Sequence, residues 1–251
     1  MGVKRRQSGR AAERQEAIVP HRLPSSNIVT RRVQVDVGNH AHVSGLLVRP
    51  TDARLLCVLA HGAGAGMAHP FMETVAERLA GKGIATLRYQ FPYMEQGRKS
   101  PDFPKVATAT VRAAVHKAAE LVPDLPLVAG GKSFGGRMTS TAVSQEPLPG
   151  VRGLVFLGFP LHRPGVPGVE RAEHLRKVRV PMLFLQGTRD ALADLEAMTQ
   201  LCAQLGTRAT LHAVEGGDHS FKVLKRSGRT EHEVMDELGV VIDDWTTNLL
   251  R

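Results

Sequence analysis

A serine flanked by glycines is the first feature of this sequence that points to chemistry. Ser133 lies in GGKSFGG (130–136), after a short apolar run (125–129) and before a segment of helical composition (138–145). Glycines two positions before and after a serine, between a strand and a helix, are typical of a sharp turn that exposes a nucleophilic hydroxyl. Side chains at 131 and 135 would collide with the neighbouring strand and helix. We expect Lys132 to point away from the pocket.

A serine hydroxyl is a poor nucleophile at neutral pH, so it needs a base, and the base needs a carboxylate to orient it. His219 follows paired glycines in GGDHSF (216–221), after the last predicted strand, and is the candidate base. Asp190 ends QGTRD (186–190), after the preceding predicted strand, and is the candidate carboxylate. Two alternatives exist for this carboxylate. Asp194 lies one helical turn beyond Asp190, and Asp218 is adjacent to the base.

The negative charge that develops during acyl transfer needs two backbone amides. One is the amide of Phe134, at the start of the predicted helix. The second should come from the loop HGAGAGM (61–67), where we expect the amide of Ala63, with Gly64 as the next choice. Gly62 and Gly64 would let substrate approach the backbone.

The same glycine-rich loop has an alternative interpretation as a phosphate cradle. The spacing is not GxGxxG, no acidic residue follows the next strand, and the loop lacks a P-loop lysine with its Ser/Thr. Tyr89 and Phe91 follow a predicted strand (84–87) at the same edge of the sheet. They are expected to form one wall of the substrate pocket, the alternative being that they only pack the loop.

The elements that must position these residues alternate along the chain. Apolar runs predict buried parallel strands, and helical patterns separate them. Two alternating segments around Gly38-Asn39 predict an antiparallel hairpin. The expected fold class is therefore α/β, with a doubly wound, mostly parallel sheet and no large cap domain, because residues 158–178 are too few for one. The predicted strands are 32–37, 43–48, 55–60, 84–87, 125–129, 154–157, 182–185 and 211–214.

Composition separates the chain into two parts. The 251 residues carry a net charge of +9, and residues 1–32 hold eight Lys and Arg against two Glu. We predict a basic, flexible N-terminal arm over residues 1–30 and a single domain over 31–251. A nucleic-acid contact is the alternative role for the arm.

Other sequence signals predict where the protein works and what it binds. We expect no secretory signal and no membrane span, since no long apolar run follows the basic start or occurs later. Two cysteines in 251 residues indicate a reduced, cytoplasmic protein. No set of metal ligands has a recognisable spacing, so neither metal nor cofactor is expected. The expected partner is a small-molecule acyl substrate, with no obligate nucleic acid.

The chain resembles the α/β-hydrolase superfamily over residues 30–251. More narrowly it is similar to dienelactone-hydrolase-like proteins related to testis-expressed protein thirty and to a subunit of the non-specific lethal acetyltransferase complex. The motifs that carry this resemblance are HGAGAGM (61–67), RYQFPY (88–93), GGKSFGG (130–136), GFPLH (158–162), LQGTRD (185–190) and GGDHSF (216–221).

The resemblance implies a small, capless serine hydrolase with its triad on Ser133, Asp190 and His219. Some relatives are scaffold subunits, so a non-catalytic interaction protein of the same fold is the alternative function. Better-known dienelactone hydrolases carry cysteine where this chain has Ser133, so the resemblance does not extend to lactone specificity.

Overall fold

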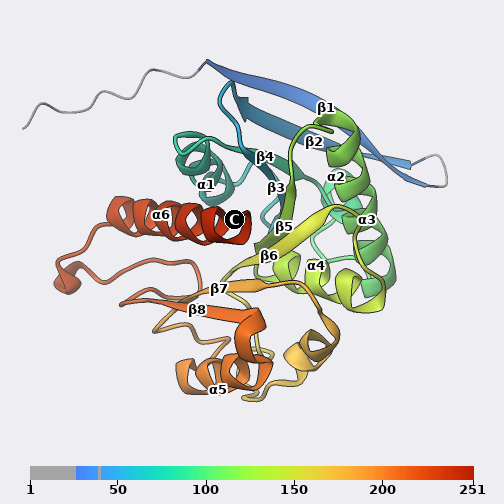
Figure 1. The fold of residues 1–251 in the computed structure, drawn as a ribbon. Coiled ribbons are helices and arrows are strands. Elements are labelled where there is room, and N and C mark those ends of the chain that lie inside the picture. Colours follow the sequence, from blue (N-terminus) through green and yellow to red (C-terminus); the bar gives the residue numbers. More distant parts are fainter. Residues whose placement is uncertain (1–26, 39–40) are drawn as a thin grey trace, which may run out of the picture.

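Helices cover both faces of one eight-stranded sheet in the computed structural model (Figure 1). The structure describes residues 27–38 and 41–251. Almost all of the predicted basic arm therefore lies outside the described residues. So does Asn39 of the predicted hairpin turn.

The sheet is parallel except at one edge. Its strand order is β1-β2-β4-β3-β5-β6-β7-β8, and β2 pairs antiparallel with both β1 and β4. The remaining pairs are parallel, as the continuous apolar runs predict. The strands are β1 (Ile28–Gly38), β2 (Ala41–Pro50), β3 (Leu55–Ala60), β4 (Ile84–Tyr89), β5 (Leu127–Lys132), β6 (Val151–Leu157), β7 (Met182–Gly187) and β8 (Ala209–Val214).

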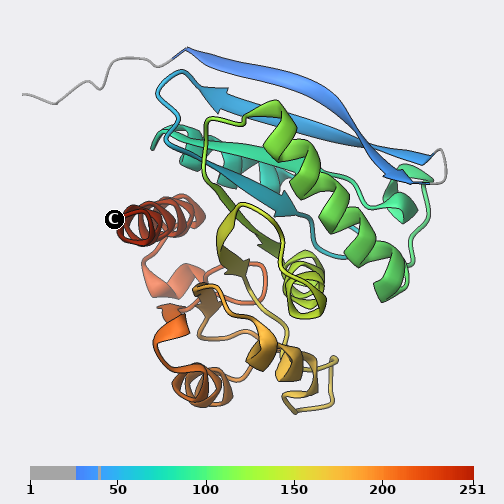
Figure 2. The same cartoon turned by 45° about the vertical axis from the view of Figure 1, so that its right-hand side comes forward.

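The helices divide between the two faces of the sheet (Figure 2). One buried cluster joins α1 and α6 to one face, and a larger cluster joins α3, α4 and α5 to the other. The helices are α1 (Pro70–Ala80), α2 (Pro92–Glu95), α3 (Pro104–Leu121), α4 (Phe134–Gln145), α5 (Leu195–Leu205) and α6 (Glu231–Leu249). Three short 3-10 helices are η1 (Glu170–Lys177), η2 (Gly206–Arg208) and η3 (Lys225–Ser227).

Local sequence explains where the main helices begin. Pro70 starts α1 after His69, whose Nδ1 accepts a hydrogen bond from the Phe71 amide. Thr230 and Glu233 form a reciprocal capping box at the start of α6. These caps satisfy amides that have no partner inside the helix.

The predicted fold class is confirmed. All six residues of β3, β4, β5 and β7 are buried, which explains why apolar and small side chains dominate these strands. The buried polar exceptions are Thr86, Arg88, Lys132 and Gln186. The segment between β6 and β7 adds only η1, so no large cap covers the sheet. None of the described helices combines the length and the apolar character needed to cross a membrane.

Candidate active site

Ser133 occupies a strained turn between β5 and α4. Its φ of 49° and ψ of −111° lie outside the regions that residues with a Cβ prefer. A Cβ at Gly131 would lie 2.1 Å from the Ala60 carbonyl oxygen, and one at Gly135 would lie 2.5 Å from the same atom. Both glycines are therefore required by close backbone approach to β3. The turn leaves the serine side chain partly exposed at the carboxyl edge of the sheet.

Three side chains predicted from separate loops meet at this edge. Ser133 Oγ lies 2.8 Å from His219 Nε2, and His219 Nδ1 lies 2.7 Å from Asp190 Oδ2. Because an ionised carboxylate only accepts hydrogen bonds, this geometry favours the tautomer with its proton on Nδ1. Nε2 is then free to accept the serine proton.

The Asp190 carboxylate is held by further donors. Its side chain is fully buried, and Oδ2 also accepts a 2.5 Å hydrogen bond from Gln186 Nε2. Oδ1 accepts a 2.8 Å hydrogen bond from the Leu192 amide. These contacts orient the carboxylate toward the imidazole. Gln186, the first residue of QGTRD, was not singled out from the sequence.

The two alternative carboxylates have structural tasks instead. Asp194 caps α5 by accepting a hydrogen bond from the Ala197 amide. Asp218 accepts hydrogen bonds from the amides of Ser220 and Lys222 and so folds the loop that carries His219. Neither of these carboxylates forms a hydrogen bond with the His219 imidazole, whereas Asp190 does.

The loop after β3 runs beside Ser133, and His61 orients it. A Cβ at Gly62 would lie 3.9 Å from the serine Cβ. His61 Nδ1 lies 2.7 Å from the Gly62 carbonyl oxygen, and His61 Nε2 accepts from the Phe91 amide. In a trans peptide the N–H points opposite to the C=O. The Ala63 amide therefore points away from His61.

The two amides predicted for the second oxyanion donor differ in their surroundings. The Gly64 amide donates a 2.8 Å hydrogen bond to the Tyr93 hydroxyl, so it is already engaged. Ala63 lines the cavity beside Ser133. Phe134 is the first residue of α4, where an amide has no partner within the helix. The geometry therefore favours Ala63 over Gly64 as the partner of Phe134.

The expectation that Lys132 points away from the pocket is wrong. Lys132 lines the cavity, and its Nζ donates a 2.6 Å hydrogen bond to the His219 carbonyl oxygen. The ammonium lies 5.9 Å and 5.8 Å from the ring centroids of Phe71 and Phe221. Burial lowers the pKa of this lysine to about 8. Its partners belong to α1 and to the loop after β8, so the residues next to Lys132 in the sequence do not reveal this orientation.

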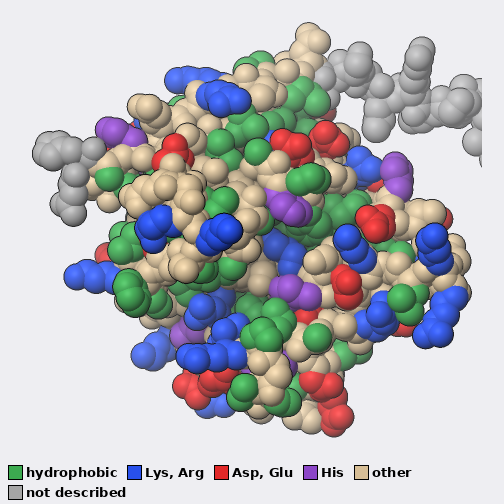
Figure 3. All heavy atoms as spheres, turned by 180° about the vertical axis from the view of Figure 1, so that it is seen from behind, with side chains coloured by type: hydrophobic (Ala, Val, Ile, Leu, Met, Phe, Trp, Pro, Cys, Tyr) green, Lys and Arg blue, Asp and Glu red, His purple; other side chains and the backbone are tan. Residues whose placement is uncertain are grey.

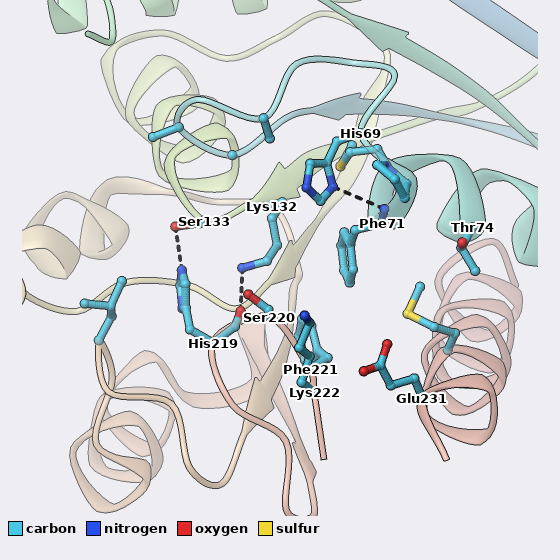
Figure 4. Close-up of a pocket in the computed structure, with 17 residues that line it drawn as sticks. His69, Phe71, Thr74, Lys132, Ser133, His219, Ser220, Phe221, Lys222 and Glu231 are labelled. Carbon is cyan, nitrogen blue, oxygen red and sulfur yellow. Dashed lines mark hydrogen bonds between the residues drawn. The ribbon is translucent and has the colours of Figure 1, made fainter. Parts of the chain in front are cut away.

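The cavity has a volume of about 740 Å³ and extends from Ser133 between α1 and α6 (Figure 4). Phe71 and Phe221 stack beyond the Lys132 side chain, with ring centroids 5.8 Å apart. Phe221 holds a φ of 62°, so the loop backbone is strained where it places this ring. Glu231 and Lys222 lie at the exposed far end. Sequence patterns did not reveal the cavity wall formed by Phe71 and Phe221, because these residues come from separate elements.

The predicted roles of Tyr89 and Phe91 as pocket residues are corrected by their positions. Tyr89 is still part of β4, and its side chain is buried in the core with 1% exposure. Phe91 is completely buried and packs against the rings of His61 and Phe134. Neither residue lines the cavity. The structure therefore agrees with the alternative prediction, in which both residues only pack the loop. Gly62 does line the cavity, whereas Gly64 does not.

Neither of the two cysteines lines the cavity. Cys57 and Cys202 are buried and unpaired, and burial raises their thiol pKa to about 12 and about 11. A thiol held protonated is a poor nucleophile. Over residues 27–38 and 41–251, no group of His, Cys, Asp or Glu side chains is arranged to hold a metal ion.

Comparison with protein families identifies the fold from the sequence. The family model described as "Alpha/beta hydrolase domain" matches residues 53–247. The chain belongs to this α/β-hydrolase family. The match covers every strand from β3 to β8 and both loops that meet Ser133.

Solved α/β-hydrolase structures share this architecture. A dienelactone hydrolase from Anabaena variabilis superposes with a TM-score of 0.69 at 22% identity, over 88% of this chain and 98% of that one. An α/β serine hydrolase without a lid from Xanthomonas campestris gives a TM-score of 0.67 at 18% identity, over 89% and 96% of the two chains. At these identities the likeness establishes the fold.

A curated relative is much longer than this α/β-hydrolase chain. A Mycobacterium tuberculosis protein, provisionally named a phosphoribosyl transferase, is 29% identical over 219 residues. The alignment covers 85% of this chain and 45% of that protein. The chain thus spans less than half the length of this relative.

Proposed function

We propose that this α/β-hydrolase is a serine hydrolase that cleaves an ester or related acyl bond of a small molecule. The observation that carries the proposal is the continuous hydrogen-bonded series from Ser133 through His219 to the buried Asp190. A strained serine beside a base that is itself oriented by a carboxylate is suited to nucleophilic acyl transfer.

In the proposed reaction, Ser133 Oγ attacks the acyl carbon while its proton passes to His219 Nε2. Asp190 stabilises the resulting imidazolium through Nδ1. The amides of Ala63 and Phe134 would donate to the oxyanion, and such donors typically contribute about 10²–10³ in turnover. Collapse of the intermediate breaks the bond to the leaving group, which takes the proton from Nε2. Water then attacks the acyl-enzyme by the same proton route and releases the acid.

Names of structural neighbours agree with this reaction class. Besides the dienelactone hydrolase, they include an esterase domain from Rhodothermus marinus and a cold-adapted esterase from an Arctic metagenome. The phosphoribosyl transferase name belongs to a protein of more than twice the aligned length, and the residues assembled here favour acyl chemistry instead. We also propose that the chain is related to the testis-expressed protein thirty group, on the motifs named above. The two unpaired cysteines support a cytoplasmic location.

Substitution of the serine tests the proposal directly. We expect Ser133→Ala to lower p-nitrophenyl butyrate turnover by at least about 10³-fold and to abolish labelling by a fluorophosphonate probe. Ser144→Ala is a matched control, because this serine on α4 donates to the Thr141 carbonyl oxygen and does not line the cavity. The control should keep labelling.

Two outcomes would contradict the proposal. Persistent labelling of the Ser133→Ala variant would place the nucleophile elsewhere. A correctly folded wild-type protein that neither turns over short acyl esters, thioesters or lactones nor reacts with the probe would favour the non-catalytic interaction protein. Circular dichroism of each variant separates loss of chemistry from loss of fold.

A further inference from the structure

Three arginines gather beside the helix that begins after Ser133. Arg137 lies on α4 one turn from the serine, Arg163 lies in the loop after β6, and Arg171 lies on η1. Burial and then the charges of Arg171 and Arg163 lower the pKa of the Arg137 guanidinium. Burial and then Arg163 lower that of Arg171, with Glu170 acting in the opposite direction. The three positive charges therefore repel one another.

The arginine cluster has no ion-pair partner among the described residues, although the charge of Glu170 acts on Arg171. Within the described part of the chain, Arg137, Arg163 and Arg171 form no ion pair, as is true of most of its arginines. The arginines that do pair with a carboxylate are Arg49, Arg54, Arg78, Arg88, Arg98, Arg112 and Arg229. Arg137 Nε is buried and has no hydrogen-bond partner among the described residues. A buried donor without an acceptor is costly, and so are neighbouring like charges. An anion bound between the guanidinium groups would offset the repulsion among the three charges.

Hydrogen bonds hold the elements that carry the arginine cluster against one another. His174 on η1 lies with its Nε2 2.7 Å from the Ser140 hydroxyl on α4. Burial and then Arg137 lower the pKa of this histidine to about 4, so it adds no positive charge at neutral pH. The contact fixes η1 against α4, and with it the position of Arg171 relative to Arg137. Arg171 also donates a 3.0 Å hydrogen bond to the His162 carbonyl oxygen.

The arginine cluster adjoins the candidate active site. The guanidinium of Arg137 lies 5.9 Å from the ring centroid of Phe134, the residue after the serine. The His162 amide donates to the carbonyl oxygen of Leu192, a residue that lines the cavity. Arg163 is exposed and the other two arginines are half-buried, so an ion from solvent can reach them. Figure 3 shows Lys and Arg side chains gathered at the lower left, on the side that carries α4 and η1.

We propose that Arg137, Arg163 and Arg171 form a binding site for a phosphate-type oxyanion beside the candidate nucleophile. Guanidinium groups bind phosphate oxygens through paired N–H donors, and three of them match an anion of more than one charge. The phosphate belongs either to a larger organic molecule or to free inorganic phosphate. Binding at this site does not require Ser133 to be the nucleophile.

Calorimetric titration of the full chain tests the site. Inorganic phosphate and phenyl phosphate are titrated separately at fixed ionic strength, because salt screens charge interactions. We expect Arg163→Gln and Arg171→Gln to weaken binding roughly ten- to a hundredfold. Arg152→Gln is the control, since it removes the same charge from an exposed arginine at the start of β6. The control should bind as the wild type does.

The outcomes separate the two sources of phosphate and the two proposals. Tighter binding of phenyl phosphate indicates an organic phosphate, and equal binding of the two indicates the free ion; both support the site. Absence of binding, or equal weakening by Arg152→Gln and Arg163→Gln, overturns it. Arg163 is exposed, so its variant stays informative even where Arg171→Gln fails to fold. Ser133→Ala should keep phosphate binding, which distinguishes failure of this site from failure of the hydrolase proposal.

Discussion

Lys132 joins the strand before the serine to the loop that carries the candidate base. Its ammonium donates to the His219 carbonyl oxygen and lies near the rings of Phe71 and Phe221. The side chain reaches these partners at a cost, because a charged ammonium loses hydration when it is buried. This cost is visible in its pKa of about 8, below the ordinary value of 10.5.

The depressed pKa of Lys132 predicts how stability changes at alkaline pH. Below pH 8 the folded protein holds a buried ammonium, and the full cost is present. Between pH 8 and 10.5 the unfolded chain binds more protons than the folded one, so the contribution of Lys132 to stability rises with pH. We therefore compare the free energy of unfolding of the wild type with that of Lys132→Met by urea denaturation. We expect the difference, wild type minus variant, to increase from pH 7.5 to pH 10.

The comparison isolates Lys132 because other titrating groups are common to both proteins. Loss of its hydrogen bond to His219 shifts the difference by a similar amount at every pH. A difference that stays constant, or falls as pH rises, would contradict the buried ammonium.

The turn between β5 and α4 shows why an element boundary can require glycine. Gly135 is the second residue of α4, where glycine has no helical advantage. Glycine is needed at this position because the backbone of the first turn of α4 lies in close contact with the backbone at the end of β3. The same close contact between α4 and β3 holds Ser133 at the edge of the sheet.

Replacing Gly135 with alanine should therefore destabilise the protein despite alanine's higher helix propensity. The added Cβ would lie 2.5 Å from the Ala60 carbonyl oxygen, and we expect a loss of about 2–4 kcal/mol in the free energy of unfolding. Gly81→Ala, at the end of α1, is the control: its φ is −62° and the nearest atom would be 3.6 Å away. It should be neutral or slightly stabilising. Equal effects of the two substitutions in urea unfolding would refute this steric explanation.

At the scale of the whole molecule, two histidines with lowered pKa values, His61 and His174, tie loops to the framework of the fold. His61 holds the loop after β3, and His174 holds η1 against α4. Burial lowers the pKa of each to about 4 from an ordinary 6.5. Both are therefore neutral in the folded protein, while an unfolded chain would protonate them below pH 6.5.

This difference predicts acid destabilisation of the whole fold. As pH falls from 6.5 to 4, the unfolded state binds more protons, so stability is lost, on the order of 2 kcal/mol for each histidine. We expect His61→Gln and His174→Gln each to flatten the dependence of unfolding free energy on pH in this window. His42→Gln, at an exposed position on β2, should follow the wild-type curve. An unchanged slope in both His61→Gln and His174→Gln would rule out these histidines as the cause.

Sequence patterns alone determined the elements and their order. Apolar runs marked the six strands from β3 to β8, and alternating segments marked β1 and β2, with boundaries shifted by a few residues. Burial on both faces selects apolar side chains in the central strands, whereas one exposed face gives alternation. Glycine spacing marked the turn at Ser133, and positions after strands singled out Asp190 and His219. Such signals are readable because parallel strands bring their carboxyl ends to one edge of the sheet.

Only the tertiary structure decided how side chains from different elements face one another. It separated Asp190 from Asp194 and Asp218, moved Tyr89 and Phe91 into the core, and turned Lys132 into the cavity. It also brought together three arginines that lie up to 34 positions apart in the chain. The physical reason is that periodicity reports burial along one element. Contacts between elements depend on the twist of the sheet, the strand register and the strained backbone at Ser133, none of which is encoded in a short run of residues.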